Sequence, residues 1–80
     1  MEKNTLEWVF EEIRQERLRQ FEKWGKQTHS DPLWFLILAE EVGEVAQAIL
    51  HSIFGGAAAG TTRTELIHVA AVAVQWLEGM

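Results

Sequence analysis

The sequence predicts an all-α protein whose three main helices form an oligomeric helical bundle. Apolar residues recur with helical periodicity through nearly the whole chain, and no alternating strand pattern is present. The 80 residues are 48% hydrophobic and include four Trp and four Phe. A chain this short cannot bury so much apolar surface alone, so we expect subunits to share a core. Residues 1–80 are predicted to form a single domain.

The first predicted helix begins at Asn4, because Glu7 follows three residues later with the spacing of a capping box. Gly25 is a natural end for this helix. Its apolar positions form one stripe: Leu6, Phe10, Ile13, Phe21 and Trp24. The second helix is predicted from Asp31, as the cap, with Pro32 at the first helical position. It should run to about Phe54, before Gly55 and Gly56.

The third helix is predicted to begin near Thr61 or Thr62 and to continue to the C-terminus. Residues 66–77 are apolar on almost every side, as expected for a helix that is covered on more than one side. The joint before it, "GGAAAG" at residues 55–60, has the glycine spacing of a phosphate-binding P-loop. Thr61 occupies the lysine position, however, and a helix rather than a strand precedes, so we predict a flexible connector.

Composition excludes several classes of function. The net charge of −5 argues against nucleic acid or an anionic membrane as a partner. The absence of cysteine excludes disulfides and thiolate metal sites. The start "MEKNTLEW" lacks an apolar signal core, so a cytoplasmic location is expected. Residues 45–62 carry no formal charge, but Gln47, His51, Ser52 and three glycines make them a poor membrane span.

The segment "AEEVGEVAQA", residues 39–48, places three acids in an apolar helix, with no Lys or Arg between Lys26 and Arg63. Residues three and four apart share a helix face. One face should therefore carry Ile37, Glu41, Glu44, Ala48 and His51. An adjacent apolar side should carry Trp34, Leu38, Val42, Val45 and Ile49.

The third helix repeats this arrangement, because Glu65 and His68 are three residues apart. Two neighbouring helices that each present such a pair can bring four ligands to one point, as in helical carboxylate metal sites. Oxygen-rich sites suit Mg²⁺ and Mn²⁺, and a cation would neutralise acids that otherwise repel each other. Other interpretations remain open. Glu41 and Glu44 could lie on a solvated face, Thr62-x-x-Glu65 could be a capping box, and His68 could be a core histidine.

The order Glu41-x-x-Glu44, then Glu65-x-x-His68, resembles the MazG-like all-α nucleoside triphosphate pyrophosphohydrolases, whose signature is ExxE followed by ExxD. The segments "ERLRQFEKWGKQTH" and "ELIHVAAVAVQWLE" are also similar to that superfamily. The resemblance covers most of the chain, residues 14–78. It implies Mg²⁺-dependent hydrolysis of a nucleoside triphosphate, usually a non-standard or surplus deoxynucleotide, to the monophosphate and pyrophosphate. It also implies a homodimer or homotetramer.

By position, the resemblance makes Glu41, Glu44 and Glu65 metal ligands, with Glu41 and Glu44 as the catalytic carboxylates. The basic residues near the expected mouth, Lys23, Lys26 and Arg63, would steady the triphosphate. Trp24 and His29 resemble the aromatic and histidine positions that contact the base and sugar of the nucleotide in related enzymes. Trp24 could instead anchor the core, and His29 could be an exposed loop residue.

His68 departs from the family pattern, because the fourth ligand there is Asp. Mg²⁺ binds nitrogen weakly, whereas Mn²⁺, Co²⁺ and Zn²⁺ accept it readily. The departure implies a site with fewer ligands, a shifted metal preference or an inactive relative. Two classes of function therefore stay open: a pyrophosphohydrolase, and a non-catalytic helical module that oligomerises or binds a partner.

Overall fold

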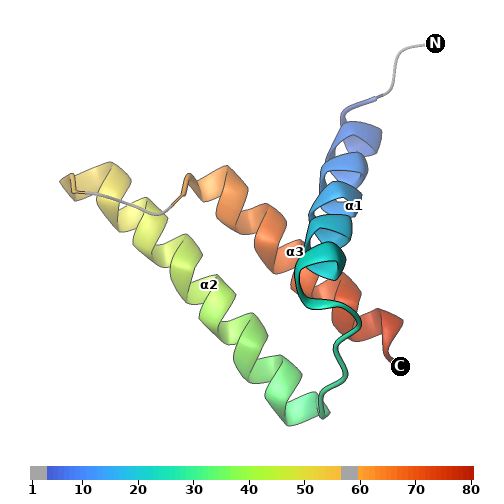
Figure 1. The fold of residues 1–80 in the computed structure, drawn as a ribbon. Coiled ribbons are helices and arrows are strands. Elements are labelled where there is room, and N and C mark those ends of the chain that lie inside the picture. The colour runs from blue at the N-terminus through green and yellow to red at the C-terminus, as the bar shows by residue number, and fades with distance from the viewer. Residues whose placement is uncertain (1–3, 57–59) are drawn as a thin grey trace.

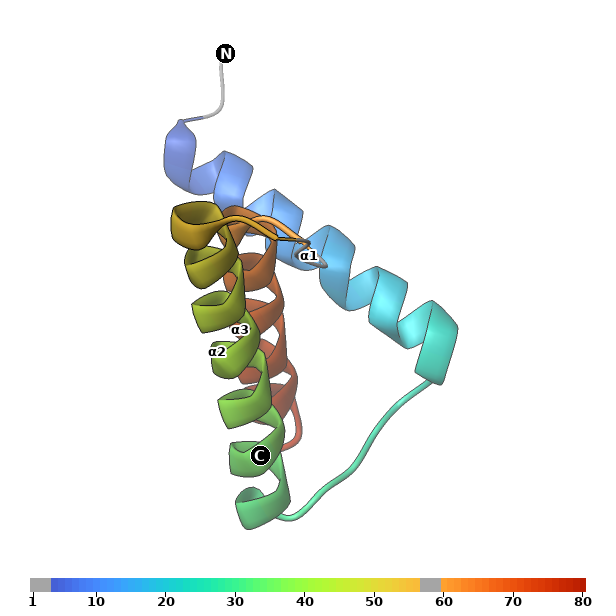
Figure 2. The same cartoon turned by 90° about the vertical axis from the view of Figure 1, so that its left-hand side faces the viewer.

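The computed structural model describes residues 4–56 and 60–80, which form three α-helices and no strand. The helices are α1 (Thr5–Trp24), α2 (Asp31–Phe54) and α3 (Thr62–Glu78). In Figure 1, α2 and α3 lie side by side and run in opposite directions, while α1 crosses α3. The view in Figure 2 shows α1 inclined across the α2–α3 pair. The predicted all-α class and the three helices are confirmed.

The ends of α1 and the C-terminal end of α2 follow the local signals in the sequence. Asn4 Oδ1 accepts a hydrogen bond from the Glu7 backbone N–H at 2.8 Å, which caps α1 as predicted. Gly25 and Gly55 follow α1 and α2 with φ of 69° and 85°. Glycine adopts this backbone region without the steric cost of a Cβ atom, which explains both ends. Residues 57–59 of the predicted connector lie outside the described residues.

The start of α2 was predicted one residue too late. Ser30, not Asp31, is the cap, because Ser30 Oγ accepts from the Leu33 backbone N–H at 3.4 Å. Asp31 is the first residue of the helix, and Pro32 is the second rather than the first. The Asp31 carboxylate instead accepts a hydrogen bond from Trp76 Nε1 at 2.8 Å, which ties the start of α2 to the end of α3. Because the Asp31 side chain is bonded to Trp76, Ser30 rather than Asp31 caps α2.

The central helix is α3, which packs against α2 on one side and α1 on the other. Ala71 is fully buried and Val72 is 5% exposed, as predicted for a helix covered on more than one side. Among the described residues, α1 and α2 make no comparable contact with each other. Two arginine–carboxylate pairs fasten α1 to α3, namely Arg17–Glu78 at 3.0 Å and Glu12–Arg63. Polar contacts thus contribute to the attachment of α1.

Few apolar side chains are buried within one chain. The buried hydrophobic residues in the described part are Trp34, Ala48, Ala71 and Val72. Most of the predicted α1 stripe is exposed: Leu6, Phe10, Phe21 and Trp24 are each more than half exposed. The apolar side predicted for α2 is only partly covered, because Val42 is 52% and Ile49 is 42% exposed. None of the described helices is long and apolar enough to cross a membrane.

Candidate metal centre

The inner face of α2 carries the acids, and it meets α3. Glu41 and Glu44 from α2 converge with Glu65 and His68 from α3. One ligand atom from each of the four residues lies within 4.8 Å of the others. These four residues are called the acidic cluster below. The convergence inferred from the two i, i+3 pairs is thus present in the structure.

Local sequence explains how α3 presents its half of the cluster. Glu65 lies in the first turn of the helix and is 5% exposed, the only buried charged residue in the described part of the chain. A Cβ atom on Gly60 would lie 2.5 Å from Glu65 Oε1, so the missing side chain at residue 60 makes room for the carboxylate. His68, one turn later, places Nδ1 3.3 Å from Glu65 Oε2.

Two alternative interpretations of the acids do not hold. The carboxylates of Glu41 and Glu44 are half-buried against α3 rather than on a solvated face. The capping box at Thr62 and Glu65 is wrong, because Thr61 is the cap and its Oγ1 accepts from the Thr64 backbone N–H at 3.1 Å. The first three helical positions end at Thr64, so Glu65 lies beyond the box. Helix capping therefore does not explain why Glu65 is buried.

Glu41 shows the electrostatic cost of this arrangement. Burial raises the pKa of the Glu41 carboxyl, and the neighbouring carboxylate of Glu44 raises it further. Glu41 Oε2 is buried and has no hydrogen-bond partner. A buried oxygen without a partner is unfavourable unless a ligand satisfies it. The three carboxylates are the oxygen donors that Mg²⁺ and Mn²⁺ prefer, and the imidazole adds a nitrogen donor that Mn²⁺ accepts more readily than Mg²⁺.

A cleft of about 320 Å³ opens beside the cluster. Three cluster members, Glu41, Glu44 and His68, line it, together with side chains from all three helices. The other lining residues are Glu16, Arg19, Gln20, Trp24, Gln27, Trp34, Ile37, Val72 and Gln75. Of the five predicted substrate-binding residues, Trp24 lines this cleft, and its side chain is 62% exposed.

Lys23, Lys26 and His29 do not line the cleft, but each contacts a residue or a cavity beside it. Lys23 Nζ lies 5.0 Å from the centroid of the Trp24 ring. Lys26 lines a separate cavity of about 420 Å³, which shares Gln27 and Gln75 with the cleft. The His29 ring packs edge-on against Trp34 at 4.7 Å between centroids, so His29 supports the wall of the cleft. It is half-buried rather than an exposed loop residue.

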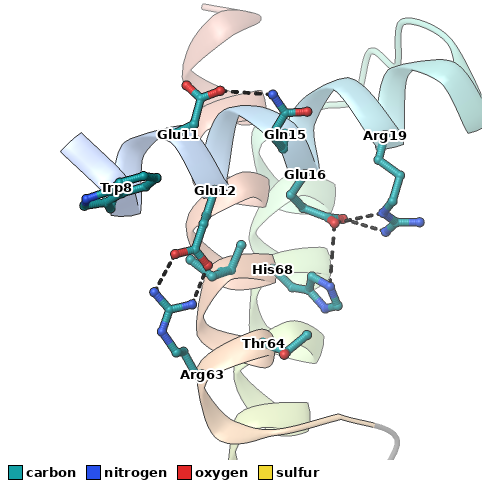
Figure 3. Close-up of a pocket in the computed structure, with 10 residues that line it drawn as sticks. Trp8, Glu11, Glu12, Gln15, Glu16, Arg19, Arg63, Thr64 and His68 are labelled. Carbon is teal, nitrogen blue, oxygen red and sulfur yellow. Dashed lines mark hydrogen bonds and ion pairs between the residues drawn. The ribbon is translucent and has the colours of Figure 1, made fainter. Parts of the chain in front are cut away.

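Arg63 does not line the cleft. Its guanidinium pairs with Glu12 across α1 and α3, beside a second cavity of about 430 Å³ (Figure 3). That pairing raises the pKa of Arg63 and lowers the pKa of Glu12. The cavity also contains His68, Glu16 and Arg19, which line the cleft as well. Arg63 is thus paired with Glu12 and is not among the residues that line the cleft.

Five polar residues of the cleft were not predicted, and they belong to α1, to the segment after it and to α3. They are Glu16, Arg19, Gln20, Gln27 and Gln75. Gln75 follows His68 by seven residues, so helical spacing alone places it on the same face. No comparable signal exists for Glu16 and Arg19, because their position depends on how α1 crosses α3.

Comparisons of the chain with protein-family models, with curated proteins and with solved structures found no match. The candidate site is therefore defined by the geometry of its own residues.

Melting temperatures separate ligation from helix capping at the start of α3. Thr61→Ala removes the cap and should cost about 1 kcal/mol of stability whether or not Mg²⁺ is added. Glu65→Gln removes a carboxylate of the cluster, so it should abolish the rise in melting temperature that Mg²⁺ gives the unaltered protein. Equal losses in both variants, unaffected by Mg²⁺, would show that Glu65 is not a ligand.

Proposed function

We propose that the chain is a metal-dependent nucleoside triphosphate pyrophosphohydrolase of the MazG-like type, acting on a deoxynucleotide in a house-cleaning role. The observation that carries the proposal is the acidic cluster, in which ligand atoms of Glu41, Glu44, Glu65 and His68 lie within 4.8 Å of one another. The unsatisfied Glu41 Oε2 supports it, because a cation would remove the cost of burying that oxygen.

The four cluster residues would hold Mg²⁺, or Mn²⁺ where the imidazole nitrogen is a ligand. When bound, such a cation binds phosphate oxygens and lowers the pKa of water. Glu41 and Glu44 also supply carboxylate oxygens that can accept a proton from an attacking water. Their position on the inner face of α2, beside the cleft, keeps this chemistry partly screened from solvent.

The cleft provides the contacts for a nucleotide. The exposed Trp24 ring offers an apolar face on which a base can stack, and Gln27 and Gln75 offer amide donors and acceptors nearby. Lys23, in the last turn of α1, and Lys26, just after the helix, would steady the triphosphate. His29 would contribute indirectly, through its packing on Trp34.

A panel of nucleoside and deoxynucleoside triphosphates, incubated with the chain and Mg²⁺ or Mn²⁺, tests the proposal. Pyrophosphate and the monophosphate should form from at least one member, and a chelator should stop the reaction. Release of inorganic phosphate with the diphosphate would indicate a different bond cleavage and contradict the proposal. No turnover of any nucleotide would favour the second candidate, a non-catalytic helical module.

The exposed apolar surface favours self-association under either candidate. Side chains such as Phe10, Phe35, Ile53 and Phe54 are between 59% and 79% exposed in the single chain. Burying apolar surface contributes roughly 25 cal/mol per Å², so covering these side chains would favour association. We propose a homodimer or homotetramer in which neighbouring subunits cover α1 and α2.

Light scattering at micromolar concentration should therefore give at least twice the chain mass of 9.1 kDa. Ile53→Lys, on the exposed end of α2, should shift the population toward smaller species, because a charge would be buried in the shared core. Thr64→Lys, at an exposed polar position of α3, is the matched control and should leave the mass unchanged. A stable monomer of the unaltered protein would contradict the shared core.

A further inference from the structure

The cleft continues from the acidic cluster along the α2–α3 pair to two glutamines, Gln27 and Gln75. Gln75 follows His68 by seven residues, or about 10 Å along the axis of α3. Because α2 runs in the opposite direction (Figure 1), its first turn lies at this end, where Asp31 is bonded to Trp76. The cleft therefore has carboxylates at one end and side-chain amides at the other.

Apolar side chains line the cleft between its two ends. Val72 lies between His68 and Gln75 on α3, and it is 5% exposed. Ile37 lies on α2 between Trp34 and the first acid of the cluster, and it also lines the cleft. A nucleotide has the same order of chemical groups, because its sugar separates the charged phosphates from the base. With the phosphates at the acidic cluster, the base therefore lies toward the amides.

The two amides are bonded to each other. Gln75 Nε2 donates to Gln27 Oε1 at 3.5 Å, and both side chains are half-buried. Within the described residues, this is the one hydrogen bond that either amide makes. An amide has two N–H donors and a carbonyl acceptor, so the N–H groups of Gln27 and the Oε1 of Gln75 remain for a ligand.

This pair offers one donor and one acceptor whichever way the amides are turned. Rotating both by 180° reverses the bond between them and leaves Gln75 Nε2 and Gln27 Oε1 for a ligand instead. Bases are commonly recognised through hydrogen bonds to the Watson–Crick edge, on which a donor lies beside an acceptor. The amide pair is complementary to such an edge.

We infer that Gln27 and Gln75 are specificity-determining residues that bind the Watson–Crick edge of the base. The inference rests on the proposed function and names the residues that choose among its substrates. A site built to hydrogen-bond a substrate rejects an analogue that lacks the matching group, because the polar groups of the site are then left unpaired. At 3.5 Å the bond between the amides is long, so a base replaces it at little cost.

Steady-state kinetics with Mn²⁺ and the deoxynucleoside triphosphates of adenine, guanine, cytosine, thymine and uracil test the role. The unaltered protein should prefer one base. Gln27→Met and Gln75→Met should each lower kcat/KM for that base by about tenfold, mainly through KM, and should lower the values for the other bases less. Unchanged ratios between bases in both variants, or equal use of all bases by the unaltered protein, would overturn the inference.

The matched control is Gln20→Met. Gln20 lines the same cleft, but its amide is bonded within α1, to Arg17 and Glu16. This variant should therefore leave the ratios of kcat/KM between bases unchanged. A merely structural role of the Gln27–Gln75 bond predicts another result, in which Gln75→Met lowers the melting temperature and slows all nucleotides by the same factor. That result would also overturn the inference.

A change in the substrate tests the same contact in the unaltered protein. Methylation of the ring nitrogen on the Watson–Crick edge of the preferred base blocks that position, so kcat/KM should fall by about tenfold or more. In Gln75→Met the methylated and unmethylated nucleotides should differ less. Equal use of both nucleotides by the unaltered protein would show that the edge is not bound.

Binding of the matching deoxynucleoside monophosphates, measured by calorimetry with Mn²⁺, needs no hydrolysis. The same base preference should appear and should weaken in Gln75→Met. Hydrolysis whose base preference ignores both glutamines would overturn this inference and leave the proposed function intact. Glutamine-dependent base preference in binding, without hydrolysis of any triphosphate, would overturn the proposed function and support the recognition role. Absence of both binding and hydrolysis in the unaltered protein would overturn both.

Discussion

Replacing Glu41 or Glu44 with glutamine should lower the rate of pyrophosphate release by about a hundredfold or more if metal activation is the main catalytic term. Each change keeps the shape of the side chain but removes one charge from a cluster whose ligand atoms lie within 4.8 Å of one another. Helix content, measured by circular dichroism, should hardly change, because glutamine and glutamate have similar helix propensities. Both variants should also lose the stabilisation that Mg²⁺ gives.

The matched control is Glu40→Gln, which neutralises the adjacent acid on the exposed side of α2. It lowers the net negative charge by the same amount but should keep nearly full activity. Full activity in both Glu41→Gln and Glu44→Gln would place the reaction at another site. Unfolding of both would show that the acids are structural.

Replacing His68 with aspartate should tighten Mg²⁺ binding and raise Mg²⁺-dependent activity. A carboxylate at this position supplies the oxygen that Mg²⁺ prefers and adds a negative charge beside the ion, provided that the shorter side chain reaches it. The unaltered protein should work relatively better with Mn²⁺ or Co²⁺, because both accept nitrogen. Titrating activity with each metal measures the preference.

The same variant should be less stable than the unaltered protein when no metal is present. A fourth carboxylate beside Glu41, Glu44 and Glu65 adds repulsion, and burial already raises the pKa of the Glu41 carboxyl. The order of stability should therefore reverse between metal-free and Mg²⁺-bound protein. His68→Asn, which removes the imidazole without adding charge, should not show the reversal. Unchanged metal affinity and preference in His68→Asp would make His68 a packing residue.

Local signals in the sequence predicted the helices well. Asn4 marks the start of α1 because its side chain accepts a hydrogen bond from a backbone N–H that the helix leaves unpaired. Gly25 and Gly55 mark the ends of α1 and α2 because glycine readily adopts the backbone conformation found there. The first residue of α2 does not follow from the sequence alone, because Ser30 and Asp31 are adjacent and both are good helix caps. The distant Trp76 engages Asp31, and a sequence pattern cannot show that contact.

The acidic cluster was predictable, whereas most of the cleft was not. Spacing of three residues on two adjacent helices places Glu41 with Glu44 and Glu65 with His68, whatever the rest of the fold does. Glu16 reaches His68 only because α1 crosses α3 at one particular place. That crossing depends on pairs such as Arg17 and Glu78, which are 61 residues apart in the chain.

The exposed apolar stripe of α1 shows the limit of periodicity. A repeat of Leu6, Phe10 and Phe21 predicts that one side of the helix is buried, but it does not say against what. Within one chain these residues remain more than half exposed. The pattern is consistent with burial by another subunit, which stays a prediction.

We expect α1 to have a lower local stability than the α2–α3 pair. No residue of α1 is buried, and among the described helices α1 packs closely on α3 and not on α2, so its release exposes less apolar surface than separation of α2 from α3. Within one chain, we expect α1 to exchange its amide hydrogens through frequent local opening, while α2 and α3 exchange only when the whole pair unfolds. Glu16, Arg19 and Gln20 of α1 form one wall of the cleft. Each local opening of α1 would therefore expose Glu41 and Glu44 to solvent while α2 and α3 stay packed together.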